Sequence, residues 1–120
     1  MASNIVDKNL YNEQNVVKVV TAESLEMSEF PDAIDFIRKT TNENKNTYHH
    51  LGIYCYQFET LKNFVSLKQS NNEIKKNLEQ LRALDNNIKI NVSLAKESPI
   101  GVDTEKDYVA IKKIMEYKSK

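Results

Sequence analysis

The sequence has few of the residues that mark secreted, membrane-spanning or nucleic-acid-binding proteins. Cys55 is its single cysteine, so no internal disulfide can form and a reducing, cytoplasmic compartment is expected. No apolar run approaches the roughly 18 residues needed to cross a bilayer, and the N-terminus lacks the basic start and apolar stretch of a secretory signal. Lys plus Arg equals Asp plus Glu, at 17 each, so the basic excess typical of nucleic-acid binders is missing as well. We therefore expect partners that are neither nucleic acid nor membrane.

Glycine, proline and arginine are also scarce, while the rest of the composition is that of an ordinary globular domain. The 120 residues, 40% of them hydrophobic and 28% charged, suffice for one small domain with a single core. Apolar patterns predict strands and helices without strict alternation, which indicates an α/β sheet with some antiparallel pairing. Strands are expected at residues 15–21, 33–38, 48–57 and 88–95, and short helices at 59–66, directly after Ser70 and from 104 onward.

The helix signals are the most explicit of these patterns. Ser70 offers an N-cap, and the helix of about 11 residues behind it carries an apolar stripe at helical spacing, formed by Ile74, Leu78 and Leu81. Thr104 and Asp107 form a weak capping box before the last helix. In that last helix a second apolar stripe is expected to face the core, formed by Tyr108, Ile111 and Met115.

Residues 48–57 contain the first side chains that could carry chemistry. On a strand, His50, Gly52, Tyr54 and Tyr56 share one face, and His50 and Tyr54 lie about 13 Å apart at the backbone. Gly52 has no side chain, so a ligand could lie over the backbone there. Taken alone, the segment is better explained as a half-buried strand that bends or packs closely at its glycine.

Other polar residues become candidates by their positions. Glu79 and Gln80 point away from the apolar stripe of their helix, where they could hydrogen-bond sugar hydroxyls. Asp103 stands in a loop between a strand and a helix, a place from which a carboxylate can hold Mg²⁺. Arg38 could make two parallel bonds to a sugar-acid carboxylate. Each is, by itself, better explained as a solvated helix face, a turn residue or a surface arginine, and no Walker loop, Cys/His metal spacing or Ser-His-Asp pattern accompanies them.

Taken together and in order, these segments resemble the C-terminal half of the CMP-KDO synthetases, the 3-deoxy-manno-octulosonate cytidylyltransferases. The family's strand Arg/His-His-Leu/Ile-Gly-Ile-Tyr-x-Tyr is matched by His49–Tyr56. Its helix Leu-Glu-Gln-Leu-Arg-x-Leu-Glu is matched by Leu78–Leu84, with Asp85 in place of the last Glu. Its Gly-Val-Asp-Thr-x-x-Asp loop is matched by Gly101–Asp107. The match covers nearly the whole chain, and the ordered set is far more specific than any one motif.

The resemblance implies a fold, a reaction and partners. The fold would be α/β, the C-terminal half of a nucleotide-diphospho-sugar-transferase (Rossmann-like) mixed-sheet fold, with residues 1–120 as its sugar-acid-binding portion. The reaction would transfer CMP from CTP to the sugar acid KDO and release pyrophosphate, for lipopolysaccharide biosynthesis. The family further implies Mg²⁺ as cofactor and a cytoplasmic homodimer.

The resemblance also assigns roles to individual residues. Asp103 would be the catalytic aspartate and one of two Mg²⁺ ligands. Arg38 would be a further substrate contact, although Ile37 replaces the serine that precedes the arginine in the family. The side chains expected to contact KDO directly are His50, Tyr54, Glu79 and Gln80. One common cleft is expected to bring together His50, Tyr54, Gln80 and Asp103.

The family's N-terminal part has no counterpart in residues 1–14. That part carries the loop that holds the CTP phosphates, so we expect the nucleotide-binding half to be missing and this chain alone to show no measurable synthetase activity. Two alternatives stay open. One is a cytidylyltransferase for a related acidic or amino sugar, and the other is a non-catalytic α/β module that serves only for association.

Overall fold

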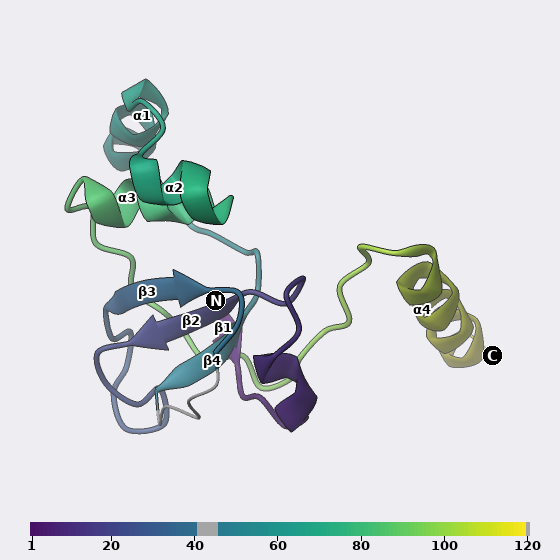
Figure 1. Cartoon of the computed structure of the whole chain (residues 1–120). Coiled ribbons are helices and arrows are strands. Elements are labelled where there is room, and N and C mark those ends of the chain that lie inside the picture. The colour runs from purple at the N-terminus through teal and green to yellow at the C-terminus, as the bar shows by residue number, and fades with distance from the viewer. Residues whose placement is uncertain (41–45, 120) are drawn as a thin grey trace.

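A small antiparallel sheet forms the centre of the molecule (Figure 1). The structure is a computed structural model that describes residues 1–40 and 46–119. The sheet has the strand order β1-β4-β2-β3, and neighbouring strands are antiparallel. Its strands are β1 (Ala2–Ser3), β2 (Lys18–Thr21), β3 (Ala33–Ile37) and β4 (Thr47–His50). The strands predicted at 15–21 and 33–38 are therefore confirmed, whereas β1 has no signal in the sequence.

One face of this sheet carries the hydrophobic core. Val19 lies between Phe36 on β3 and Tyr48 on β4 in the register, and all three side chains are buried. Leu78 and Leu81 pack on this face from the helical segment that follows the sheet, so the core lies between the sheet and this segment. Burial of these apolar side chains is the main stabilising term of the fold.

The opposite face of the sheet carries several polar side chains and is less completely buried. Lys18 is fully buried there, and its Nζ donates hydrogen bonds to the carbonyl oxygens of Glu13, at 2.7 Å, and Arg38. Burial lowers the pKa of this ammonium group. The short 3-10 helix η1 (Lys8–Tyr11) precedes the loop that supplies the Glu13 carbonyl. Through these two hydrogen bonds Lys18 holds the N-terminal loop against the end of β3.

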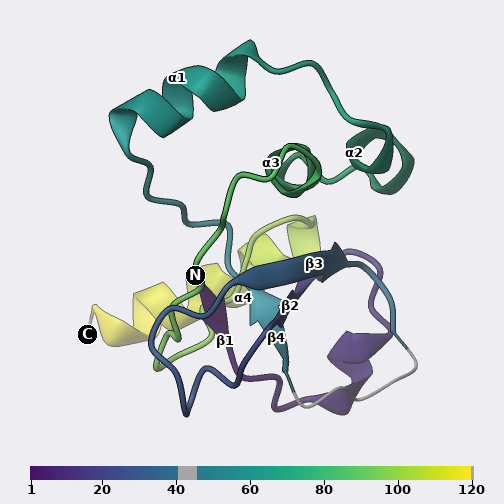
Figure 2. The same cartoon turned by 90° about the vertical axis from the view of Figure 1, so that its left-hand side faces the viewer.

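Three short helices lie above the apolar face of the sheet, the second and third side by side and the first further away from them (Figures 1 and 2). They are α1 (Phe58–Ser66), α2 (Asn71–Lys76) and α3 (Gln80–Asp85). Ser70 caps α2 as predicted, in a capping box with Glu73. The single helix predicted after Ser70 is wrong, because Asn77 adopts the left-handed conformation, with φ 52° and ψ 51°, and ends α2. Leu78 and Leu81 remain buried, while Ile74 is exposed.

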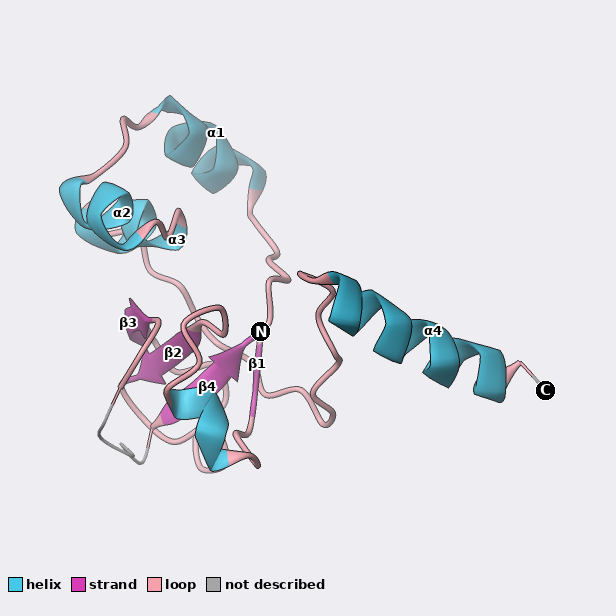
Figure 3. Cartoon of the chain, turned by 45° about the vertical axis from the view of Figure 1, so that its right-hand side comes forward, coloured by secondary structure: helices cyan, strands magenta, loops and turns pink. Residues whose placement is uncertain are grey.

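The last helix, α4 (Glu105–Lys118), is set apart from the rest of the chain (Figure 3). Thr104 and Asp107 form the predicted capping box. The prediction that its apolar stripe faces the core is wrong, since Tyr108 and Met115 are 49% and 66% exposed. The extended residues before Thr104 carry α4 away from the sheet, so local capping rather than packing defines this helix.

Two predicted strands are shorter or more irregular than the pattern indicates. The strand predicted at 48–57 leaves the sheet after His50, because the amide of Ile53 turns back to the carbonyl of Leu51 at 2.7 Å. Residues 88–95 make only isolated bridges, from Asn91 to Asp32 and from Leu94 to Ala2. This segment crosses the end of the sheet from β3 to β1, so it cannot pair with either strand over any length. The expected mixed α/β class is nevertheless confirmed.

Candidate functional site

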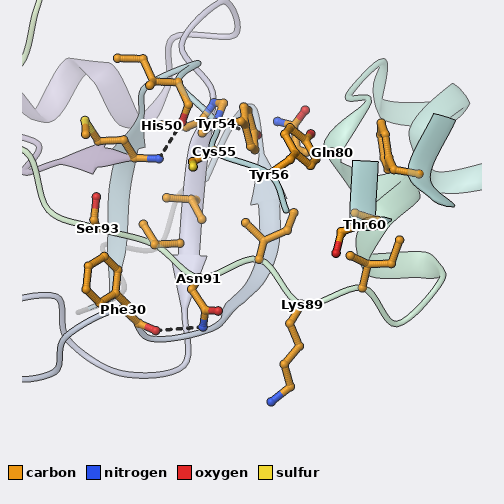
Figure 4. A pocket seen from close by; sticks show the side chains of 18 of the residues that line it. Phe30, His50, Tyr54, Cys55, Tyr56, Thr60, Gln80, Lys89, Asn91 and Ser93 are labelled. Carbon is orange, nitrogen blue, oxygen red and sulfur yellow. Dashed lines mark hydrogen bonds between the residues drawn. The ribbon is translucent and has the colours of Figure 1, made fainter. Parts of the chain in front are cut away.

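A cavity of about 500 Å³ opens where the apolar face of the sheet meets the helices (Figure 4). Its walls come from the end of β4 with the connection 51–57, from α1 and α3, and from the crossing segment 88–93. The lining is largely aromatic and aliphatic, with a few polar groups. This combination is typical of small-molecule sites.

His50 and Tyr54 meet at this cavity through their side chains. The Tyr54 hydroxyl and His50 Nε2 lie 2.8 Å apart, and the ring centroids are 5.5 Å apart. A continuous strand would hold the two residues too far apart for this contact. The turn at Leu51–Ile53 takes Gly52 and Tyr54 out of the sheet and brings the phenol back over the imidazole.

A row of aromatic rings, which we call the aromatic wall, continues from this pair along the cavity. It consists of Phe36, His50, Tyr54, Tyr56 and Phe64, all of which line the cavity. Successive ring centroids are 5.3, 5.5, 6.0 and 6.1 Å apart, within the range of favourable aromatic pairs. The wall therefore connects the sheet core to α1 through side chains.

The titratable groups of the wall are neutral near pH 7. Burial, the positive N-terminus and His49, in this order, lower the pKa of His50 to about 4. Burial, Tyr56 and the negative charge of Glu79 raise the pKa of Tyr54. The His50–Tyr54 pair can therefore donate and accept hydrogen bonds but carries no charge there.

Gln80 and Glu79 stand next to each other at the start of α3 but differ in their relation to the cavity. Gln80 is half-buried and lines it. The side chain of Glu79 is 70% exposed and lies 3.9 Å from Arg82. Glu79 is not among the lining residues. Burial is the main cause that raises the pKa values of Tyr54 and Tyr56, and the negative charge of Glu79 acts in the same direction.

Arg38 lies outside the lining and is occupied by the protein itself. Its guanidinium donates to the carbonyl oxygens of Gln14, Lys76 and Asn77 at 3.2, 3.0 and 2.8 Å. Two of these acceptors belong to the C-terminal end of α2, where carbonyl groups lack helical partners. In this arrangement Arg38 ties β3 to the helices and presents no free fork to a ligand.

Asp103 is likewise separate from the cavity. It is exposed in the loop before α4, and its backbone amide donates to the Asp107 carboxylate at 3.3 Å. Among residues 1–40 and 46–119, no group of three or more His, Cys, Asp or Glu side chains could hold a metal ion. Of the residues predicted to surround one cleft, the structure thus brings together His50, Tyr54 and Gln80 but not Asp103.

Several lining residues were not singled out by the sequence. Thr60 and Phe64 come from α1, and Lys89, Asn91 and Ser93 from the crossing segment. The side-chain amide of Asn91 donates to the Phe30 carbonyl oxygen at 2.9 Å and to the Asp32 carboxylate at 2.8 Å. These two hydrogen bonds fix the far end of the cavity (Figure 4). A further lining residue, Tyr56, was indicated by the sequence, because it shares a predicted strand face with His50.

The fold and the cavity define a mixed α/β domain with a cavity of a size that suits a small molecule, and comparisons with known proteins specify it further. No family model matches the chain. The 3-deoxy-manno-octulosonate cytidylyltransferase of Bartonella tribocorum is 39% identical over 116 residues, which cover 96% of this chain and 47% of the relative. That of Sinorhizobium medicae is 40% identical over 112 residues, covering 92% of this chain and 44% of the relative.

A solved structure agrees with these matches. A CMP:2-keto-3-deoxy-manno-octonic acid synthetase complexed with CTP superimposes with a TM-score of 0.78 at 27% identity, covering 98% of this chain and 48% of that one. The resemblance to the CMP-KDO synthetase family is therefore confirmed over nearly the whole chain. The chain spans about half the length of the curated relatives it matches.

None of the helices along the described residues has the length and apolar character that a bilayer crossing requires.

Proposed function

We propose that this chain supplies the sugar-acid-binding part of a cytidylyltransferase that transfers CMP from CTP to KDO with release of pyrophosphate, for lipopolysaccharide biosynthesis. The observation that carries the proposal is the convergence of His50, Tyr54 and Gln80 on one cavity of about 500 Å³. The similarity to named cytidylyltransferases over 96% of the chain supports the same reaction class. A cytoplasmic homodimer remains part of the proposal.

The cavity residues have properties that suit a hydroxyl-rich ligand. The Tyr54 phenol, the neutral His50 imidazole and the Gln80 amide offer uncharged donors and acceptors. The rings of Tyr54 and Tyr56 offer apolar faces to the C–H groups of a sugar. Lys89 also lines the cavity, but its ammonium group lies 3.5 Å from the Asp32 carboxylate and is paired with it. These residues would hold and orient the acceptor sugar, the part of catalysis that comes from positioning.

Mg²⁺ and its predicted ligand Asp103 enter the proposal with a restriction. Mg²⁺ binds through few protein carboxylates and takes its other ligands from water and substrate phosphates, so the Asp103 carboxylate is a suitable donor. The described residues offer no carboxylate cluster around it. Asp103 therefore stays a predicted ligand and catalytic residue, and we derive no step of the reaction through the metal.

Calorimetric titration of the chain with KDO tests the binding part of the proposal. We expect saturable binding to the wild-type chain and a loss of about tenfold in affinity, or ~1.4 kcal/mol, for Gln80→Ala. Gln14→Ala is the matched control, because Gln14 is an exposed glutamine outside the cavity lining. The same titration with a neutral sugar and with other acidic and amino sugars tests the substrate class.

Absence of KDO binding, or equal loss of affinity in both variants, would contradict this site. A tighter complex with another acidic or amino sugar would replace KDO in the proposal. In a CTP-dependent pyrophosphate-release assay we expect no turnover from the 120-residue chain by itself, since it spans about half of its relatives. Robust turnover would overturn that expectation.

A further inference from the structure

An ion pair outside the cavity contacts the end of the aromatic wall. Arg82 Nε donates to Glu73 Oε2 at 2.9 Å, and Arg82 Nη2 donates to Glu73 Oε1 at 2.6 Å. The two side chains are only 13% and 5% exposed. Such a two-bond pairing fixes the plane of the guanidinium as well as its position.

Glu73 is itself held from a second direction. Its Oε2 accepts the backbone N–H of Ser70 at 3.1 Å, as part of the capping box of α2. Hydrogen bonding to Arg82 is the main cause that lowers the pKa of Glu73 to about 2, so the carboxylate is ionised near pH 7. The ion pair therefore links the start of α2 to α3.

The fixed guanidinium of Arg82 contacts the aromatic wall at Phe64. The Arg82 Cζ atom lies 5.0 Å from the centroid of the Phe64 ring, a distance at which cation–π attraction acts. Phe64 is buried and contacts Tyr56 with a centroid distance of 6.1 Å. Neither Arg82 nor Glu73 lines the cavity, whereas Phe64 and Tyr56 do.

We propose that Arg82, oriented by Glu73, is a positioning residue that fixes the aromatic wall of the sugar cavity by acting through Phe64. The role of the wall in holding a sugar rests on the function proposed above. Lysine cannot replace arginine in this role, because an ammonium group lacks the planar fork that pairs with a carboxylate and stacks on a ring at the same time. The contact network, Glu73–Arg82–Phe64–Tyr56–Tyr54–His50, ends at the hydrogen-bonding pair of the cavity.

The pKa of His50, measured by NMR in the absence of any sugar, reports on the far end of this network. The groups that act on this imidazole are the N-terminal ammonium, His49 and Tyr54. None of these residues is substituted in the variants below. If the wall loosens, water reaches the imidazole and its pKa rises from about 4 toward the ordinary value of 6.5. A general loss of stability in a chain that remains folded does not move this pKa.

Two variants keep the test independent of folding. Arg82→Lys retains a positive charge beside Glu73 but loses the stacked fork. The double variant Glu73→Gln with Arg82→Met removes both charges together and so leaves no unpaired buried ion. Lys76→Met is the control, because Lys76 also joins the helices to the sheet, through Asp35 at 3.2 Å, but lies outside the cavity lining.

We expect the pKa of His50 to rise in Arg82→Lys and in the double variant, and to stay at its wild-type value in Lys76→Met. We also expect KDO affinity to fall about tenfold in the first two. An unchanged pKa of His50 in the folded Arg82 variants overturns the proposal. If the wild-type chain binds no KDO, the proposed function fails, while the pKa comparison still decides whether Arg82 positions the wall.

Discussion

The Tyr54 hydroxyl lies 2.8 Å from His50 Nε2, although the two residues are four positions apart on a segment that strand geometry would extend. The contact exists because the chain leaves the sheet directly after His50 and turns at Leu51–Ile53. The turn converts two residues of one strand face into a hydrogen-bonded pair at the wall of a cavity. Both groups are neutral near pH 7, so the pair supplies polarity without charge.

Removal of the Tyr54 hydroxyl should separate this hydrogen bond from the packing of the ring. In Tyr54→Phe the ring can still stack on Tyr56, and only the hydrogen bond to His50 is lost. We therefore expect the unfolding free energy to fall by about 0.5–1 kcal/mol. Urea denaturation measures it. Tyr56→Phe is the control, and it should change stability by less. An equal loss in both variants would mean that the His50–Tyr54 bond contributes nothing specific.

The lowered pKa of His50 predicts that acid destabilises the fold. His50 titrates near 4 in the folded chain and near 6.5 when unfolded, so between these values the unfolded state binds more protons. The contribution of His50 is therefore complete above pH 6.5 and is lost as the pH falls toward 4. We expect the unfolding free energy to decrease over this window, and His50→Gln to flatten the decrease.

Denaturation at a series of pH values measures this slope, and an NMR titration assigned to His50 gives the pKa directly. His49→Gln should leave most of the contribution of His50 in place, because burial and the positive N-terminus, the two larger causes of its lowered pKa, are unchanged. The pKa of His49 is also lowered, mainly by burial, so it contributes in the same direction. A His50 pKa near 6.5 in the folded chain would contradict the buried, neutral imidazole.

The break between α2 and α3 depends on the backbone of Asn77. Its left-handed conformation costs about 1–2 kcal/mol for a residue with a Cβ atom, least for asparagine. We expect Asn77→Ala to destabilise the fold by about 1 kcal/mol and Asn77→Gly to be neutral or stabilising. Thermal unfolding compares the two. Equal stability of the alanine and glycine variants would contradict the left-handed break.

The sequence predicts those parts of this molecule that depend on local chemistry. The caps at Ser70 and Thr104 and the β-branched strand β2 are visible in it, because hydrogen-bonding side chains and apolar runs act over a few residues. The turn after His50 and the break at Asn77 are not, because each depends on contacts with distant segments. Thus Leu51 is held by the Met1 carbonyl, and Asn77 by Arg38.

The residues of the candidate site likewise divide into those that local motifs identified and those that only the fold brings together. The motifs identified His50, Tyr54 and Gln80, which share the cavity. The lining residues of segment 88–93 were missed, because only the crossing of that segment over the end of the sheet brings Lys89 and Asn91 to the cavity. The ion pair of Glu73 and Arg82 was missed for a similar reason, since the pattern predicted one continuous helix where the structure has two.

The two capping boxes should have different consequences for stability, because one helix packs against the core and the other does not. Ser70 caps α2, whose neighbour α3 buries Leu81, whereas Thr104 caps α4, which has no fully buried residue. Loss of an N-cap hydroxyl costs about 1 kcal/mol of helix stability. In Ser70→Ala we expect this cost to appear in the free energy of global unfolding.

In Thr104→Ala the same local cost should appear only in α4. We expect faster amide hydrogen exchange at Glu105–Lys118 and an unchanged urea midpoint, because a helix that contributes little buried surface can unfold without the core. Tyrosine fluorescence during denaturation and hydrogen exchange of both variants measure the difference. A drop in the global midpoint of Thr104→Ala equal to that of Ser70→Ala would show that α4 unfolds together with the sheet, and the view of α4 as an independent helix would have to be abandoned.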